Sequence, residues 1–246
     1  MTPDLPPIPC FQTARSADIQ PHNAFSSSSV PEKAYIALHR MPLSGDCMGK
    51  LGTSLQKLGM APFADGSVDY EYDSDSMELT LKAVQLVLSD AASAIATTTL
   101  RGVNLNVLDN WQNIPPKELQ QKLLWQLPIV QLGRTTLEID NQFLFQRWAN
   151  FEAQNTPSVK NTESDRQRFF QEQLQKFTFL PQAIRQQLIE RLPDLTSKPQ
   201  KIRLEISPKE APVSLAEVSL MFLTPAGQES PFQQLVQQKL NWRLSK

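Results

Sequence analysis

The stretch 65-DGSVDYEYDSDSMELTL-81 contains two runs in which every second residue is apolar. The apolar members are Val68, Tyr70 and Tyr72 in the first run and Met77, Leu79 and Leu81 in the second. Alternation of this kind is typical of a β-strand with one buried face. Because Asp65-Gly66 is a common turn dipeptide, we expect a turn there, followed by two strands that form a hairpin or meander.

Apolar runs on both sides of this stretch predict further strands. A short strand that begins at Lys33 would place Ala34, Ile36 and Leu38 on one face. Four other segments have strand-like composition: 95–107, which Gly102 divides, 129–139, 202–206 and 213–223. The sequence therefore predicts a sheet of several strands.

Apolar residues at helical spacing and capping residues predict the helices. The clearest start is Ser230-Pro231-Phe232-Gln233, with Ser at the N-cap, Pro at the first position and Gln at the third. Five other helices are predicted. The first two are 46–60 and one that begins after Pro115-Pro116, with Leu119, Leu123, Leu124 and Leu127 as its apolar residues. The other three are one capped by Asp140 with Leu144, Trp148 and Phe151, one from Thr162 with Phe169, Phe170, Leu174 and Phe177, and one from Pro181 with Ile184, Leu188 and Leu192.

The order of these elements predicts an α+β fold. Strands fill the first half, helices cluster between 115 and 195, and a strand pair and an amphipathic C-terminal helix close the chain, so we expect an antiparallel or mixed sheet packed against several helices. Residues 1–31 are rich in Pro and Ser and are expected to be a flexible, disordered arm. Residues 32–246 are expected to form a single α+β domain, with 155–164 as a possible internal linker.

Composition limits the classes of partner. The chain of 246 residues has a formal net charge of −1, so it lacks the basic character of nucleic-acid-binding proteins.

The first ten residues have neither a basic segment nor an apolar run, which argues against a secretory signal and favours a cytoplasmic location. No apolar run is long enough for a transmembrane helix. Cys10 and Cys47 are expected to be free thiols.

Residues typical of catalytic or metal sites are few. The segment 44–50 contains Gly45, Gly49 and Lys50, but its spacing does not fit a phosphate-binding loop. His39 and Cys47 could act as base and nucleophile, although no third orienting residue can be named. With only one other histidine, His22, a histidine-based metal site is not expected, and no cofactor is predicted.

Two surfaces are candidates for binding. Asp69, Glu71, Asp73 and Asp75 would share one face of a strand, in a stretch with no Lys or Arg between Lys57 and Lys82. They would form a solvated face, a docking surface for a basic partner or a Ca²⁺ site, although the residues from Asp69 onward do not fit an EF-hand loop.

The second surface is the C-terminal helix, whose apolar arc would contain Trp242 with Lys239 and Arg243 near its middle. These cations would either extend to solvent or meet an acidic group. Trp125, opposite the leucine stripe of its own helix, would be either sandwiched between layers or exposed as an interface anchor.

Three functional hypotheses follow. The first is a non-enzymatic interaction or assembly-accessory protein that binds a protein partner through the acidic face and the C-terminal helix. The second is a carrier of an apolar or lipid-like anionic ligand under that helix, in a cavity lined by Leu79, Leu81, Leu204 and Leu220, with Lys239 and Arg243 at its mouth. The third is a cysteine-dependent enzyme that uses Cys47 and His39.

Overall fold

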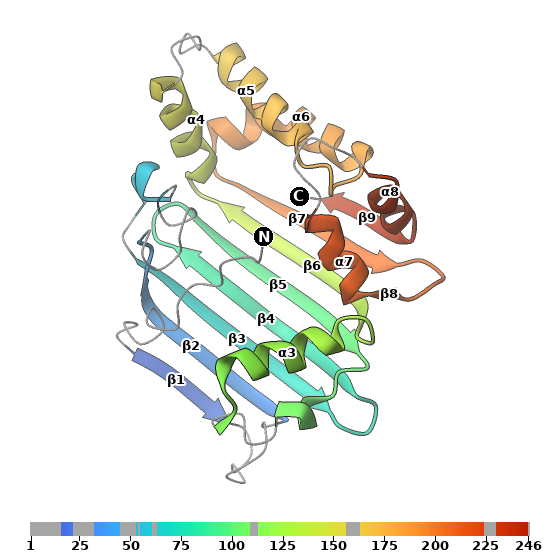
Figure 1. Cartoon of the computed structure of the whole chain (residues 1–246). Coiled ribbons are helices and arrows are strands. Elements are labelled where there is room, and N and C mark those ends of the chain that lie inside the picture. Colours follow the sequence, from blue (N-terminus) through green and yellow to red (C-terminus); the bar gives the residue numbers. More distant parts are fainter. Residues whose placement is uncertain are drawn as a thin grey trace.

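The computed structural model of the chain is a wide antiparallel sheet, and most of its helices lie on the side of the sheet formed by β6, β7 and β9 (Figure 1). The structure describes residues 16–21, 32–44, 53, 55–60, 63–108, 113–155, 163–223 and 230–245. Within these residues the sheet has nine strands, and the predicted α+β fold is confirmed.

From β1 to β7, each strand of the sheet pairs with the strand that precedes it in the chain. The main path runs through β1 (Ser16–Pro21), β2 (Lys33–Pro42), β3 (Phe63–Asp73), β4 (Glu78–Leu88), β5 (Ala92–Arg101), β6 (Gln131–Asn141), β7 (Gln200–Pro208) and β9 (Leu240–Ser245). The short strand β8 (Val213–Ser214) pairs with β6 instead, beyond the end of the β6–β7 ladder. All of these pairings are antiparallel.

The helices described by the structure follow the predicted clustering. They are η1 (Leu105–Leu108), α3 (Pro116–Gln126), α4 (Leu144–Asn155), α5 (Glu163–Gln175), α6 (Gln182–Ser197), α7 (Leu215–Leu223) and α8 (Pro231–Gln238). Pro181 directly precedes α6, as predicted. The capping box at Ser230 is also confirmed: its Oγ accepts a hydrogen bond from the Gln233 N–H, and the Gln233 side chain accepts one from the Ser230 N–H.

The hairpin between β3 and β4 forms, but the turn predicted before it, at Asp65-Gly66, is wrong. Asp65 and Gly66 lie inside β3, and the chain reverses after Asp73. The Asp73 carboxylate accepts hydrogen bonds from the backbone of Asp75 and from the hydroxyl of Ser76, which stabilises the turn. Gly66 faces the end of the Met41 side chain, and a Cβ there would displace the Met41 methyl group, 2.8 Å away.

The segment 213–223 was wrongly predicted to be a strand. Only Val213 and Ser214 are extended, and α7 follows. Ser214 and Glu217 form a reciprocal cap, in which Ser214 Oγ accepts from the Glu217 N–H and Glu217 Oε2 accepts from the Ser214 N–H. A continuous apolar run fits a buried helix as well as a strand, so this capping pair was the distinguishing signal.

The cap of α4 was also assigned to the wrong residue. Asp140 belongs to β6, whereas the buried Asn141 accepts a hydrogen bond from the Phe145 N–H through Oδ1. Its Nδ2 donates to the Leu195 carbonyl of α6 at 3.0 Å. One side chain therefore links the end of β6, the first turn of α4 and the end of α6.

The C-terminal helix is shorter than predicted. It ends at Gln238, and residues 240–245 form β9 on the edge of the sheet. Leu240, Trp242 and Leu244 fall on one arc of a helix but also alternate along a strand, and pairing with β7 selects the strand.

Three other predictions concern segments that the structure describes only in part. Within the proposed arm 1–31, Ser16–Pro21 forms β1, and the rest of the arm lies outside the described residues. The proposed linker begins on the last residue of α4 and ends within α5, and 156–162 lies outside the described residues. Of the predicted helix 46–60, residues 55–57 are described as helical, and most of its first half lies outside them.

Candidate functional site

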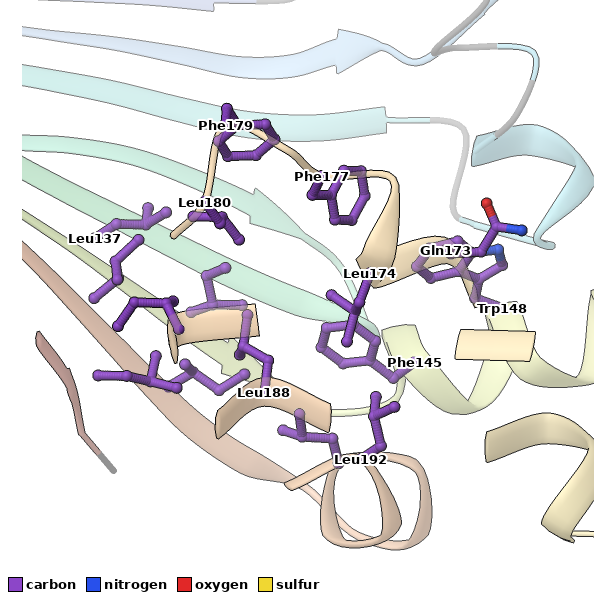
Figure 2. Close-up of a pocket in the computed structure, with 16 residues that line it drawn as sticks. Leu137, Phe145, Trp148, Gln173, Leu174, Phe177, Phe179, Leu180, Leu188 and Leu192 are labelled. Atoms are coloured by element: carbon purple, nitrogen blue, oxygen red, sulfur yellow. The ribbon is translucent and has the colours of Figure 1, made fainter. Parts of the chain in front are cut away.

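An apolar pocket lies between the helices α4–α6 and the sheet strands β6, β7 and β9 (Figure 2). Its volume is about 230 Å³. Sixteen residues line it, and Gln173 is the one polar residue among them. The apolar lining residues are Leu137, Ile139, Phe145, Trp148, Leu174, Phe177, Phe179, Leu180, Ile184, Leu188, Leu192, Leu195, Ile202, Leu204 and Leu244.

Strand alternation produces the floor of this pocket. In the antiparallel register Leu137 lies opposite Leu204, and Leu204 in turn lies opposite Leu244. Ile139 and Ile202 form the next pair on the same face. Since successive side chains of a strand point to opposite faces, this register gathers the apolar residues of three strands on one side of the sheet.

The roof of the pocket comes from the predicted apolar stripes of three helices. Along α6, Ile184, Leu188 and Leu192 recur every four residues and all three line the pocket. Leu188 and Leu192 are labelled in Figure 2. In α4, Phe145 and Trp148 pack against Leu192. The leucine and phenylalanine stripes predicted from the sequence therefore face one another, and the space between them is not filled by side chains.

Polar side chains hold this roof at its edges. The buried Gln233 of α8 donates from Nε2 to the Met221 carbonyl at 2.8 Å, and Gln237 donates to the Thr178 carbonyl at 2.8 Å. Thr178 lies between α5 and α6, so the Gln-rich face of α8 fixes the connection that carries Phe179 and Leu180 into the pocket. Two of the C-terminal glutamines are thus structural.

The predicted acidic face is partly neutralised by lysines on neighbouring strands. Asp69, Glu71 and Asp73 lie on β3, and Asp75 lies in the turn that follows. Hydrogen bonds from Lys33 of β2 and Lys82 of β4 lower the pKa of Glu71 to about 2. The pKa of Asp73 is also lowered, first by its hydrogen bond from Ser76. The spacing of residues in the sequence did not predict these two contacts, because Lys33 and Lys82 reach Glu71 from neighbouring strands.

The three predicted binding residues near the C-terminus do not form one surface. Lys239 Nζ lies 2.6 Å from Glu217 Oε1, and this contact lowers the pKa of Glu217. Trp242 packs against the core cluster of Val213, Met221, Val236 and Leu240. The prediction of a shared helical face for Lys239, Trp242 and Arg243 is therefore wrong.

Arg243 lies on the opposite face of the sheet from Trp242, within a polar ladder of charged side chains. It lines a surface hollow together with Arg134 and Glu205. Arg134 is hydrogen-bonded to Glu205 and lowers the pKa of that carboxyl, with smaller effects from Arg203 and Arg243. The position of Arg243 follows from strand alternation in β9.

Trp125 is 78 % exposed, so it is not sandwiched between layers. Its neighbours Leu124 and Ile129 are exposed to 53 % and 65 %. Together with Met77 they form a group that we call the α3 patch. Trp125, Ile129 and Met77 also line a shallow groove with a volume of about 410 Å³.

The proposed catalytic pair cannot be assembled from the described residues. His39 is half-exposed on β2, and its Nδ1 lies 3.6 Å from Asp65 Oδ1. Cys47 lies outside the described residues. Within the part of the chain that the structure describes, no group of three or more His, Cys, Asp or Glu side chains could hold a metal ion.

The predicted ligand cavity differs in place from the observed pocket. Of its four expected lining residues, only Leu204 lines the pocket. Leu79 packs beside Tyr72 and Val103, Leu81 lies on β4 away from the lining residues, and Leu220 is half-exposed on α7. The sequence signal for the pocket was present in the apolar stripes of α4, α5 and α6. The sequence did not indicate that an unfilled space would remain between these helices and the sheet.

Comparisons with known proteins identify no relative: no family model, curated protein or solved structure matches the chain. Among the described helices, none combines the length and the apolar character needed to span a membrane.

Proposed function

We propose that this chain binds an apolar small molecule or acyl chain in the pocket between α4–α6 and the sheet, and that it acts as a carrier of this ligand. The observation that carries the proposal is a lining of fifteen apolar residues and one glutamine around about 230 Å³. Protein cores are normally close-packed, and an empty apolar space of this kind destabilises them. A bound apolar ligand would offset that penalty.

The size of the pocket limits the ligand. A dry cavity of about 150 Å³ accommodates benzene, so by proportion 230 Å³ accommodates about nine carbon atoms. A longer chain would extend through the open side of the pocket into solvent. The ligand class that fits is therefore a single medium-length chain or a small ring system, without a charge on the buried part.

The test is a calorimetric titration of the full chain with linear alcohols of six to twelve carbons. Burial of each methylene contributes about 0.8 kcal/mol, so affinity should rise about fourfold per carbon. The rise should stop near nine or ten carbons, where the pocket is full. Absence of binding by every alcohol would contradict the proposal.

A pair of matched variants locates the binding site. Leu188→Trp should fill the pocket and abolish alcohol binding, because Leu188 lines it. Leu124→Trp makes the same change on the exposed surface of α3 and should leave binding unchanged. Equal binding by the two variants would place the alcohol elsewhere.

A second candidate function is a contact with another protein through the α3 patch. Large exposed aromatic and aliphatic groups that lie together mark interaction sites, and Trp is the residue most enriched among interface anchors. The test is a photo-crosslinker at Trp125 in the native cell. The partner it captures should be lost when Leu124→Ser is added and kept when Leu235→Ser is added on the exposed side of α8.

Both proposals retain the expectations of a cytoplasmic location and of no nucleic-acid partner, which rest on the sequence. The acidic residues of β3 remain a proposed docking surface. Its net negative charge is reduced, because Glu71 forms ion pairs with Lys33 and Lys82.

A further inference from the structure

The single polar lining residue of the apolar pocket lies next to a cation. Gln173 lies at one end of the row of lining side chains, and its amide group points away from the apolar residues of that row (Figure 2). Its Oε1 accepts a hydrogen bond from Lys176 Nζ at 3.2 Å. Lys176 follows the last residue of α5 and is exposed. The apolar pocket therefore has a positively charged side chain close to one of its ends.

The surrounding charges do not cancel that of Lys176. No carboxylate of the described residues lies within ion-pair distance of it, and the acidic residue nearest to it in sequence, Glu172, pairs with Arg168 at 3.4 Å. A second cation approaches the same turn, because Arg185 Nη1 donates to the Gln175 carbonyl at 3.2 Å. Two cations thus converge on the last turn of α5.

We infer, on the basis of the proposed function, that the ligand is an anionic amphiphile: its chain fills the apolar pocket and its carboxylate-like head group binds Lys176 beside Gln173. A head group at this position stays in contact with water, so it avoids the large penalty of burying a charge. The Gln173 amide can donate a second hydrogen bond to it. An ammonium head group would instead be repelled by Lys176.

The experiment compares three probes that share one chain length: decanoate, decanol and decylammonium at neutral pH. Because the apolar contribution is common to all three, differences in affinity report on the head group. A charge-assisted hydrogen bond at an exposed site should make decanoate bind about five- to tenfold more tightly than decanol. Decylammonium should bind more weakly than decanol.

Variants then test whether Lys176 causes the preference for decanoate over decanol. Lys176→Gln should bring decanoate to the affinity of decanol and leave decanol binding unchanged. Lys117→Gln removes an exposed lysine of α3 and should keep the full preference for decanoate. Both changes are on the surface, so urea unfolding midpoints should match that of the unmodified protein.

The outcomes separate this inference from the proposed function. Equal binding of decanoate and decanol by the unmodified protein, or a preference that survives Lys176→Gln, would overturn the inference about the head group and leave the pocket as an apolar site. Failure of all three probes to bind would overturn both.

Discussion

Helix α6 buries Ile184, Leu192 and Leu195 against the sheet, whereas helix α3 leaves Leu123, Leu124 and Trp125 substantially exposed. Both helices follow a proline and both have leucines at helical spacing. What distinguishes them is the partner: α6 packs with α4 and α5 over β6, β7 and β9, while α3 is tied through Gln126 to the loop after β5. An apolar stripe thus predicts a helix without predicting what covers it.

The largest expected difference between the two regions is in stability. Leu195→Ala removes a nearly fully buried side chain and should lower the free energy of unfolding by about 3 kcal/mol. Leu124→Ala makes the same chemical change on α3 and should lower it by less than about 0.5 kcal/mol. Urea denaturation followed by circular dichroism measures both. Similar losses at the two positions would mean that α3 is packed in solution.

The glutamines of α8 offer a second comparison, with a smaller expected effect. Gln233→Ala leaves the Met221 carbonyl and the Ser230 N–H without their side-chain partner and should destabilise the protein by about 2 kcal/mol. Gln234→Ala changes an exposed neighbour and should be nearly neutral. The same denaturation measurement distinguishes them, and equal effects would remove the structural role assigned to Gln233.

The α3 patch should be replaceable without loss of the fold. The double variant Leu124→Ser, Trp125→Ser should change the free energy of unfolding by less than about 1 kcal/mol, because both side chains face solvent. It should also leave binding of decanol unchanged. A large loss of stability would show that the patch is covered by the protein itself, which would argue against a role in partner binding.

The smallest effect is expected from pH, through Glu71 of β3. Lys33 and Lys82 lower the pKa of Glu71 below its value in the unfolded chain, so its contribution to stability is complete near neutral pH. That contribution is lost as the pH falls through the folded-state pKa of about 2. Glu71→Gln should therefore make stability less dependent on pH between pH 5 and pH 2. An unchanged pH profile would contradict the cross-strand pairing.

Local signals accounted for much of the fold. Alternation located β2, β3 and β4, and capping residues located the starts of α6 and α8, because these patterns depend on neighbours in the chain. The failures occurred where local signals conflict. Leu240, Trp242 and Leu244 satisfy both helical and strand spacing, and only pairing with the distant β7 decides between them.

The candidate site was harder to predict than the fold. Leu137, Leu204 and Leu244 meet because of sheet register, which no local pattern specifies. The acidic face was identified residue by residue, but Lys33 and Lys82 reach Glu71 across strands that are separated in sequence. Trp125 was recognised as unusual, and its exposure was one of the two alternatives that its helical position allowed.

The strand order has a consequence for how the protein folds. From β1 to β7 each strand is added beside the one that precedes it in the chain, and no later strand is inserted between two earlier ones. Short loops close the β3–β4 and β4–β5 hairpins, so these contacts form with little loss of loop entropy. We expect hydrogen exchange during refolding to protect the amides of β3–β5 first and those of β9 last, because β9 must reach β7 across two intervening helices.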